Sequence, residues 1–213
     1  MWVYLWLQAW CTTLATNQQT NGKTAAVMST QVVKVKTPIF KLIVAGEGGV
    51  GKTSIIHRYI TGCITTPVMT VGSEFAYQEL EVDFQKVGLS IWDFGGEERF
   101  RDLMPIFCLG AHGALLVFDL SRYSTFLQLG FWMEIIRESA GSIPVILVGA
   151  KSDLPGGPCE DDLHDFCQRH GIIAFFPVSA NTGENIDQIF SYMATRLIKA
   201  TDEGRITPAY SVR

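Results

Sequence analysis

A glycine-rich loop between a predicted strand and a predicted helix is the feature that most limits what this chain can fold into. Residues 46–53 read Gly-Glu-Gly-Gly-Val-Gly-Lys-Thr, a complete G-x-x-x-x-G-K-[ST] pattern. Residues 39–45, which are apolar except for Lys41, predict a strand before it, and the apolar periodicity of residues 52–60 predicts a helix after it. Glycines let the backbone wrap around phosphate oxygens, and the helix adds its positive N-terminal end to the same anion site. The pattern therefore predicts a P-loop for a nucleoside triphosphate, and by itself it does not choose between ATP and GTP.

Side chains of this loop have separate expected roles. Lys52 would neutralise the β- and γ-phosphates, which makes it a candidate catalytic residue, and the Thr53 hydroxyl would bind Mg²⁺. The residues of this loop that we expect to bind the nucleotide are Gly46, Glu47, Gly48, Gly49, Val50, Gly51, Lys52, Thr53 and Ser54.

The rest of the chain alternates between apolar strands and amphipathic helices. We expect strands at 114–118, 145–148 and 172–178, a hairpin of 74–82 with 87–93, and helices at 124–139, 160–169 and 185–198. This order predicts an α/β fold of the P-loop NTPase type. It would have about six strands in a mostly parallel sheet, one antiparallel hairpin strand, and helices on both faces. Ligands bind such sheets at the carboxyl ends of the strands, so the loops there are where we look for chemistry.

One such loop follows the predicted strand at 87–93. Asp93 can hold the Mg²⁺ shell through water, and Gly96 three residues later can offer its N–H to a γ-phosphate. A D-x-x-G sequence alone is a common turn. The presence of a P-loop favours a functional interpretation of Asp93, because a P-loop fold is expected to have an acid at the end of a nearby strand.

A second loop, Lys151-Ser152-Asp153, follows the predicted strand at 145–148. The Asp153 carboxylate can accept hydrogen bonds from both N1 and N2 of guanine, and adenine offers no such pair. The Lys151 stem could lie along the base. Taken alone, these residues favour a turn that opens a helix, ahead of residues 154–157.

Together with Thr70-Val71-Gly72 and Val178-Ser179-Ala180, these motifs stand in one order over residues 38–200 that resembles the small GTPases of the Ras superfamily, nearest to the Rab and Ras branches. The resemblance implies a Ras-like G domain with GTP or GDP and Mg²⁺ as ligands. It implies that Thr70 binds Mg²⁺ and the γ-phosphate, and that the Ala180 backbone contacts the guanine carbonyl. The remaining residues implied at the base are Ala150, Lys151, Asp153, Ser179 and Asn181.

The resemblance also implies a conformational output. Loss of the γ-phosphate would release two switch segments, and partner proteins would read that change. Effectors, exchange factors or activating proteins are expected to bind through residues 61–72 and 93–104.

Glu97 departs from the family pattern, because most members have a Gln there that orients the attacking water. A carboxylate cannot donate a hydrogen bond to phosphoryl oxygens, and its charge opposes theirs. We therefore hypothesise slow GTP hydrolysis, with Lys52, Thr70 and Glu97 as the candidate catalytic residues and the role of Glu97 open. An acid also suits the first turn of a helix for electrostatic reasons.

Ala150 departs as well, since it stands where the family has Asn. Losing one or two amide hydrogen bonds predicts weaker guanine binding and faster exchange, with Asp153 preserving the base preference. In the first switch no aromatic residue follows Tyr59, so the ring that covers the guanine edge in relatives is absent, and Ile64 is a candidate to fill that space.

Two functions from different classes follow from these departures. The first is a GTP-hydrolysing switch, and the second is a guanine-nucleotide-binding scaffold that hardly hydrolyses. A P-loop ATPase or nucleotide kinase has less support, because no arginine-rich lid is present and Asp153 favours guanine.

Charge divides the chain near residue 37. The whole chain has a net charge of −4, which argues against nucleic acid as a partner, yet residues 1–37 contain three lysines and no acid. We expect a leader at 1–37, a GTPase domain at 38–200 and a short tail at 201–213. The leader fits a flexible segment, a weak interfacial anchor at its apolar start, or an over-long start with Met28 as the true first residue.

The five cysteines are scattered and form no C-x-x-C pair, which favours free thiols in a reducing cytoplasm. The last residues contain no Cys, so the sequence predicts no prenyl anchor. Contact with membranes would then be peripheral and would use the N-terminus, if it occurs at all.

Overall fold

A computed structural model describes residues 36–64, 73–95 and 104–210 of the chain. The strands are β1 (Pro38–Ala45), β2 (Ser73–Val82), β3 (Gln85–Phe94), β4 (Gly113–Asp119), β5 (Val145–Ala150), β6 (Ala174–Val178) and β7 (Ala209–Tyr210). The helices are α2 (Lys52–Thr61), α3 (Met104–Cys108), α4 (Tyr123–Leu127), α5 (Leu129–Ala140), α6 (Glu160–His170) and α7 (Ile186–Asp202).

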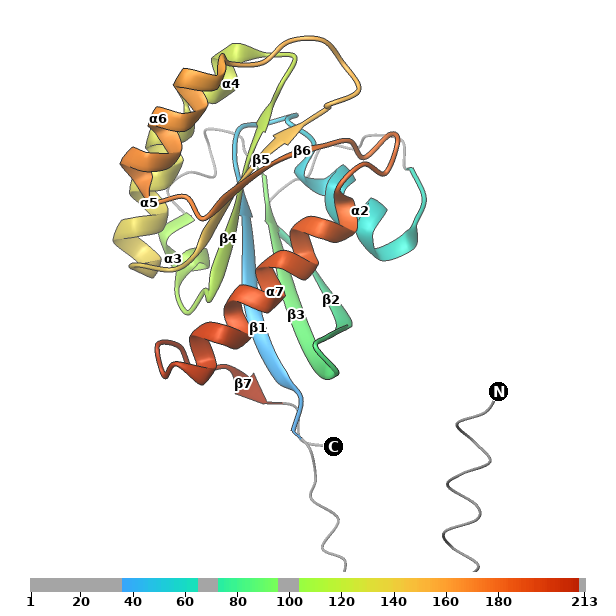
Figure 1. Ribbon diagram of the computed structural model, residues 1–213, viewed down its shortest axis with the longest axis vertical. Helices are drawn as coiled ribbons and strands as arrows, with labels where there is room; N and C mark the ends of the chain where they lie inside the picture. The colour runs from blue at the N-terminus through green and yellow to red at the C-terminus, as the bar shows by residue number, and fades with distance from the viewer. Residues whose placement is uncertain (1–35, 65–72, 96–103, 211–213) are drawn as a thin grey trace, which may run out of the picture. The chain divides into compact units, whose positions relative to one another are not determined.

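The strands form one sheet with the order β2-β3-β1-β4-β5-β6 (Figure 1). Neighbouring strands from β3 to β6 are parallel, and β2 is antiparallel to β3. The expected α/β fold with a mostly parallel sheet and one hairpin strand is therefore confirmed. β1 lies between β3 and β4, so the loop that follows β1 lies beside the ends of both neighbours.

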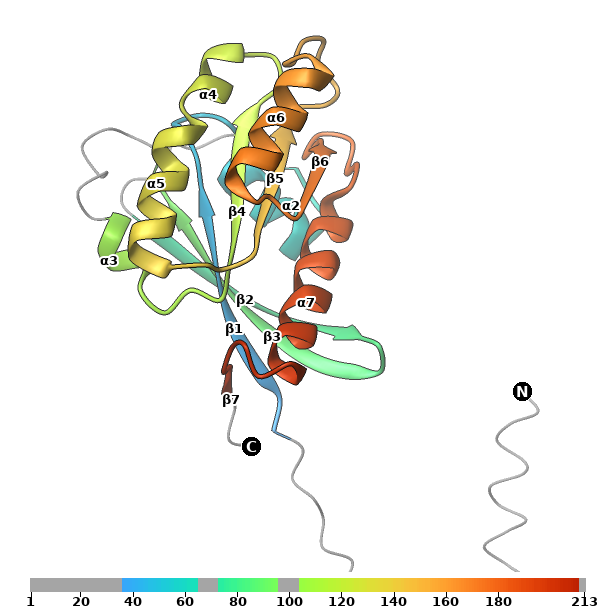
Figure 2. The ribbon, with the colours of Figure 1, turned by 60° about the vertical axis from the view of Figure 1, so that its left-hand side comes forward.

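Helices cover both faces of this sheet, as the sequence predicts. One core contains alternate residues of β1 together with apolar residues of α2 and α7. The other core contains Ile43 and Ala45 of β1 with side chains from α3, α4, α5 and α6. Figure 2 shows α5 and α7 on opposite sides of the sheet. A sheet with both faces covered explains why its central strands are apolar throughout.

A second antiparallel pairing, which the sequence does not predict, joins β7 to the start of β1, with Pro38 opposite Tyr210. His112 supports it, because its Nδ1 accepts from the Lys41 N–H at 2.9 Å and its Nε2 lies 3.1 Å from the Thr207 carbonyl oxygen. Since Nδ1 is the acceptor, the proton lies on Nε2 and is donated to Thr207. A two-residue strand is too short for any sequence periodicity to reveal.

The predicted helix at 124–139 is two helices, α4 and α5, separated at Gln128. Gln128 keeps right-handed helical dihedral angles, with φ −84° and ψ −7°. The apolar periodicity therefore continues through the break, which explains why a single helix was predicted.

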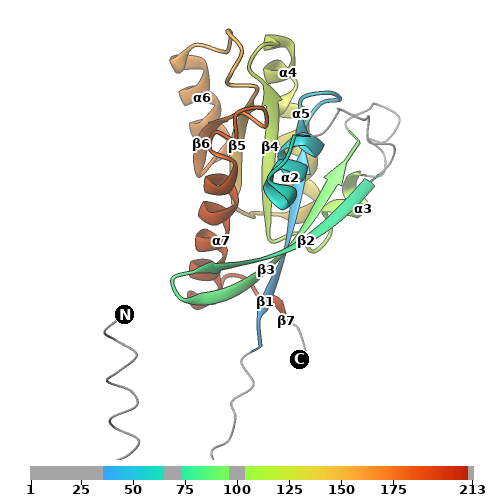
Figure 3. The ribbon, with the colours of Figure 1, turned by 90° about the vertical axis from the view of Figure 1, so that its right-hand side faces the viewer.

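The edge strand β2 presents aromatic side chains to solvent. Phe75 is 75% exposed and Tyr77 is 45% exposed, while Val82 is buried. Figure 3 shows the β2–β3 hairpin passing below α7, with its turn far from the loop that joins β1 to α2. In the described part of the chain, no helix has both the length and the hydropathy that crossing a membrane requires.

Candidate functional site

The P-loop follows β1 and has a backbone conformation that depends on glycine. Gly46 has φ +144°, and a Cβ atom on it would lie 2.0 Å from the Val117 carbonyl oxygen of β4. Gly51, at φ +108°, occupies the position before the first residue of α2. Any side chain at Gly46 would displace the loop from β4, so the close approach of loop and strand requires glycine.

Lys52, the first residue of α2, points back into this loop. Its side-chain nitrogen donates to the carbonyl oxygens of Gly46 and Glu47, both at 2.8 Å, and the residue is only 6% exposed. Burial lowers the pKa of Lys52 to about 8, against the opposing influence of the Asp93 and Glu47 carboxylates. An ammonium group with three donors can exchange these carbonyls for phosphate oxygens without moving far.

Thr53 and Asp93 come together at the metal side of the P-loop. Asp93 lies near the end of β3, opposite Val44 of β1, and is 3% exposed. The Thr53 hydroxyl donates a hydrogen bond to its carboxylate. A hydroxyl and a carboxylate oxygen are hard donors of the kind that Mg²⁺ prefers, so the residues present fit this ion. The third expected ligand, Thr70, lies outside the described residues.

The base-recognition loops follow β5 and β6 and are joined by hydrogen bonds. The Asp153 carboxylate accepts from the Ser179 hydroxyl at 2.5 Å and from the Asn181 side-chain amide at 3.3 Å. These contacts, led by that of Ser179, hold the pKa of Asp153 below its usual range. Asp153 is therefore an ionised, acceptor-only group at neutral pH, which is the state that two N–H donors of guanine require.

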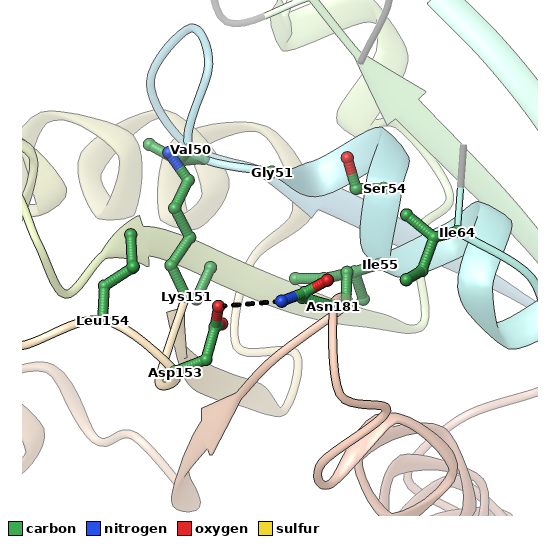
Figure 4. Close-up of a pocket in the computed structure, with 11 residues that line it drawn as sticks. Val50, Gly51, Ser54, Ile55, Ile64, Lys151, Asp153, Leu154 and Asn181 are labelled. Carbon is green, nitrogen blue, oxygen red and sulfur yellow. Dashed lines mark hydrogen bonds between the residues drawn. The ribbon is translucent and has the colours of Figure 1, made fainter. Parts of the chain in front are cut away.

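A cavity of about 250 Å³ lies between the P-loop and the base-recognition loops. Its lining residues are Val50, Gly51, Ser54, Ile55, Ile64, Ala150, Lys151, Asp153, Leu154, Ala180 and Asn181. Figure 4 shows Asp153 and Asn181 facing one another, with the Lys151 side chain running toward Val50 of the P-loop. Ile64 lines this cavity and is 58% exposed, which places it where the sequence offered it as a substitute for an aromatic residue.

Ala150, the last residue of β5, is 2% exposed and faces the P-loop. A Cβ atom on Gly51 would lie 3.9 Å from the Ala150 methyl group. The side chain at this position thus offers the P-loop an apolar contact and no hydrogen bond.

The structure brings most of the expected site residues to one edge of the sheet. The P-loop residues, Asp93, Ala150, Lys151, Asp153, Ser179, Ala180 and Asn181 all lie in the loops or strand ends there. Gly96 and Glu97 lie outside the described residues, as Thr70 does, so their placement stays a prediction.

Sequence reasoning missed three residues near the site, which are Asp119, Arg122 and Trp132. Asp119, at the end of β4, has no exposed side-chain surface and forms ion pairs with Lys151 and Arg122. Trp132 of α5 donates from its indole nitrogen to the Glu47 carboxylate of the P-loop at 3.1 Å. An acid that ends an otherwise apolar strand was a usable signal for Asp119. For Trp132 the sequence showed only that it belongs to the apolar face of a predicted helix.

The fold and this edge of the sheet define a P-loop nucleotide-binding protein. The model of the Ras family matches residues 41–199. The chain is 35% identical over 164 residues to Ras-related protein Rab-19 of Mus musculus, a match that covers 75% of this chain and 76% of that protein. It is 34% identical to Ras-related protein Rab-19 of Homo sapiens, with the same coverage. It is 33% identical over 162 residues to the putative ras-related protein Rab-5B of Dictyostelium discoideum, covering 75% and 76%.

The chain therefore belongs to the Ras family, whose members are small GTP-binding switch proteins with GTPase activity. Its similarity to relatives named Rab places it among Rab-like members of the superfamily.

Proposed function

We propose that this chain is a guanine-nucleotide switch that binds GTP or GDP together with Mg²⁺ and hydrolyses GTP slowly. The observation that supports it best is the cavity between the P-loop and Asp153. Its lining includes Val50, Gly51 and Ser54 from the phosphate side and Asp153 and Asn181 from the base side, which supports binding of one guanine nucleotide across both loops. We propose residues 38–200 as the domain that performs this function.

Binding would use backbone and side chains in different ways. The P-loop amides and Lys52 would hold the phosphates, while Asp153 would accept the two N–H donors of guanine. Ser179 and Asn181 orient the Asp153 carboxylate through their hydrogen bonds. The Lys151 stem and Ile64 would supply apolar contacts to the base.

Thr53, Asp93 through water, and Thr70 are the residues that would hold Mg²⁺. When bound, this ion neutralises charge on the β- and γ-phosphate oxygens. The hydrogen bond from the Thr53 hydroxyl to the Asp93 carboxylate holds these two side chains together at the metal side of the P-loop.

Hydrolysis would proceed by in-line attack of water on the γ-phosphate, with Lys52 and the P-loop amides stabilising charge on the leaving side. Glu97 would not orient this water as a glutamine does, because a carboxylate cannot donate to the phosphoryl oxygens. An activating partner could supply an arginine in trans.

Partner proteins would bind through residues 61–72 and 93–104. Phe75, which follows the first of these segments in the sequence, is 75% exposed and packs near the Trp92 ring, with centroids 6.2 Å apart. The Lys41 ammonium lies 4.4 Å from the Trp92 ring centroid. Exposed aromatic side chains are frequent anchors of protein interfaces.

The second candidate function is a GTP-binding scaffold with little or no hydrolysis. The apolar side chain of Ala150 and the sequence position of Glu97 favour it. Both candidates share the nucleotide site and differ in turnover.

The nucleotide that copurifies with the protein tests both candidates. Bound GDP, separated by chromatography, is the result expected of a hydrolysing switch, whereas bound GTP favours the scaffold. Adenine nucleotide, or no nucleotide and no binding of added GDP, would contradict the proposal. Single-turnover hydrolysis of GTP by the parent chain and by Glu97→Gln then measures the effect of the carboxylate, and equal rates would show that Glu97 does not slow the reaction.

A further inference from the structure

A buried carboxylate lies between the base-recognition loop and the P-loop. Asp119 accepts hydrogen bonds at one oxygen from Lys151 at 2.6 Å and from Arg122 Nε at 2.9 Å. Its other oxygen accepts from the backbone N–H of Ser121 at 2.9 Å and from the Ser121 hydroxyl at 2.6 Å. Burial alone would raise the pKa of Asp119, but these hydrogen bonds outweigh it and the pKa is lowered. A charge buried to this degree persists only with such partners, so Asp119 holds both cations in place.

Arg122 extends from this carboxylate to the P-loop. One of its terminal nitrogens donates to the Gly48 carbonyl oxygen at 3.3 Å. The same nitrogen would lie 3.7 Å from a Cβ atom on Gly49, so the guanidinium lies against two successive P-loop residues. A planar guanidinium has separate donors in fixed directions, which lets one side chain contact Asp119 and Gly48 at once.

The methyl side chain of Ala150 provides no hydrogen bond in this region. The residue is buried, its methyl group faces Gly51, and its carbonyl oxygen accepts from the Leu120 N–H at 2.9 Å. Among the described residues, a chain of side-chain hydrogen bonds runs from the base-recognition loop to the P-loop through Lys151, Asp119 and Arg122. A nucleotide in the cavity would span both loops, so freedom of one loop relative to the other would promote its release.

We propose that Arg122, held by Asp119, is a positioning residue that fixes the P-loop relative to the base-recognition loop and thereby slows guanine-nucleotide release. It performs the bracing that a hydrogen-bonding side chain at position 150 would otherwise give. This proposal rests on the proposed function of guanine-nucleotide binding.

Release of a fluorescent GDP analogue from the full chain tests the brace. We expect Arg122→Gln to release it about 3- to 10-fold faster, the effect of one lost hydrogen bond of this kind. The matched control is Arg205→Gln, which removes the same charge from an exposed ion pair with Glu203, and its release rate should equal that of the parent. Unchanged release from Arg122→Gln would overturn the proposal.

Arg122→Lys separates bracing from charge. A single ammonium keeps the positive charge but lacks two donors spaced to reach both Asp119 and Gly48, so its release should stay fast. Full recovery of the parent rate in this variant would show that the charge alone acts, and the brace would be wrong.

A double variant distinguishes positioning from general stability. In an Ala150→Asn background the new amide should share the bracing, so Arg122→Gln should accelerate release by less than about twofold. Because Asp119 is buried, Arg122→Gln should lower the melting temperature of the nucleotide-free protein more than Arg205→Gln does, and it should do so in both backgrounds. Only the difference in acceleration between the two backgrounds therefore reports positioning, and an equal acceleration in both would contradict a positioning role.

Nucleotide binding by the parent chain distinguishes failure of the proposed function from failure of the brace. A parent that does not bind the GDP analogue would overturn the proposed function and the brace with it. A parent that binds it, with Arg122→Gln releasing it at the parent rate, would overturn the brace alone.

Discussion

The phosphate half and the base half of the site obtain their shape in different ways. The P-loop depends on backbone conformation, with Gly46 packed so closely on β4 that a Cβ atom would meet the Val117 carbonyl oxygen at 2.0 Å. The base half depends on side chains, with Asp153 oriented by Ser179 and Asn181. A site shaped by backbone conformation tolerates few substitutions, whereas a site shaped by side chains can be formed by other residue types. This contrast fits a chain that has a complete P-loop pattern and an alanine at position 150.

The largest expected effect tests whether the base half selects guanine. Asp153→Ala removes two charge-assisted hydrogen bonds to the base, so we expect GDP affinity to fall at least about 100-fold. Affinity for ATP, which gains nothing from this carboxylate, should not change. Titration with fluorescent nucleotides measures both, and Asp165→Ala, an exposed acid of α6, is the control. Equal losses for ATP and GDP would show that Asp153 supports the fold and does not select guanine.

The next effect tests whether the base half has been weakened. Ala150→Asn restores an amide beside the P-loop, and we expect GDP to bind about ten- to 150-fold more tightly. Calorimetric or fluorescence titration compares it with the parent and with Ala209→Asn, which adds the same amide at an exposed position in β7. If Ala150→Asn brings no gain in affinity, the alanine is not what limits guanine binding.

The pH dependence of binding tests the phosphate half. With a Lys52 pKa of about 8 in the folded chain, the ammonium loses its proton above that pH, and GDP affinity should fall about tenfold by pH 9. Lys52→Arg keeps its charge over this range and reports any decline that comes from the base itself. An equal decline of GDP affinity in the parent and in Lys52→Arg would show that the titrating group is not Lys52.

Stability of the nucleotide-free protein should change in the opposite direction over the same range. The folded-state pKa of Lys52 lies below the usual 10.5, so the unfolded chain binds more protons between about pH 8 and 10.5. The contribution of Lys52 to the free energy of unfolding therefore rises with pH in this window. Urea denaturation of the parent and of Lys52→Arg at several pH values measures it as the difference between the two.

The smallest effect tests whether a side chain also supports the phosphate half. Trp132→Phe keeps the aromatic core contact but removes the indole donor to Glu47, and we expect GDP release to accelerate about two- to tenfold. Tyr192→Phe removes a hydroxyl donor from the opposite face of the sheet and serves as its control. Release unaffected by Trp132→Phe would show that the Glu47 side-chain contact does not hold the P-loop, which would sharpen the contrast between the two halves.

Much of this architecture was predictable because its signals are local. Buried parallel strands are continuous apolar runs, and the P-loop is eight consecutive residues with fixed chemistry. The break at Gln128 was not predictable, because the helical periodicity continues through it. The outward direction of Phe75 was not predictable either, because strand alternation does not show which face of an edge strand is exposed.

Contacts between distant segments account for the rest. Trp132 and Glu47 are 85 residues apart, and Lys151 and Asp119 are 32 apart. Such contacts can be predicted only when the strand order is known. The sequence identifies residues that could interact, and the fold determines which of them are in contact. Asp119 shows the difference, since it reads as the end of a strand and lies between the two halves of the site.

The pairing of β7 with β1 places both ends of the described domain at the end of β1 that is opposite the P-loop. Pro38 and Tyr210 are neighbours at the start of β1, while the P-loop follows its other end, about 25 Å away along an eight-residue strand. Pro38 and Tyr210 therefore lie at the same end of the sheet, opposite the nucleotide edge. A force applied to the domain through these two residues would be borne by the β7–β1 pairing and would not be applied directly to the P-loop.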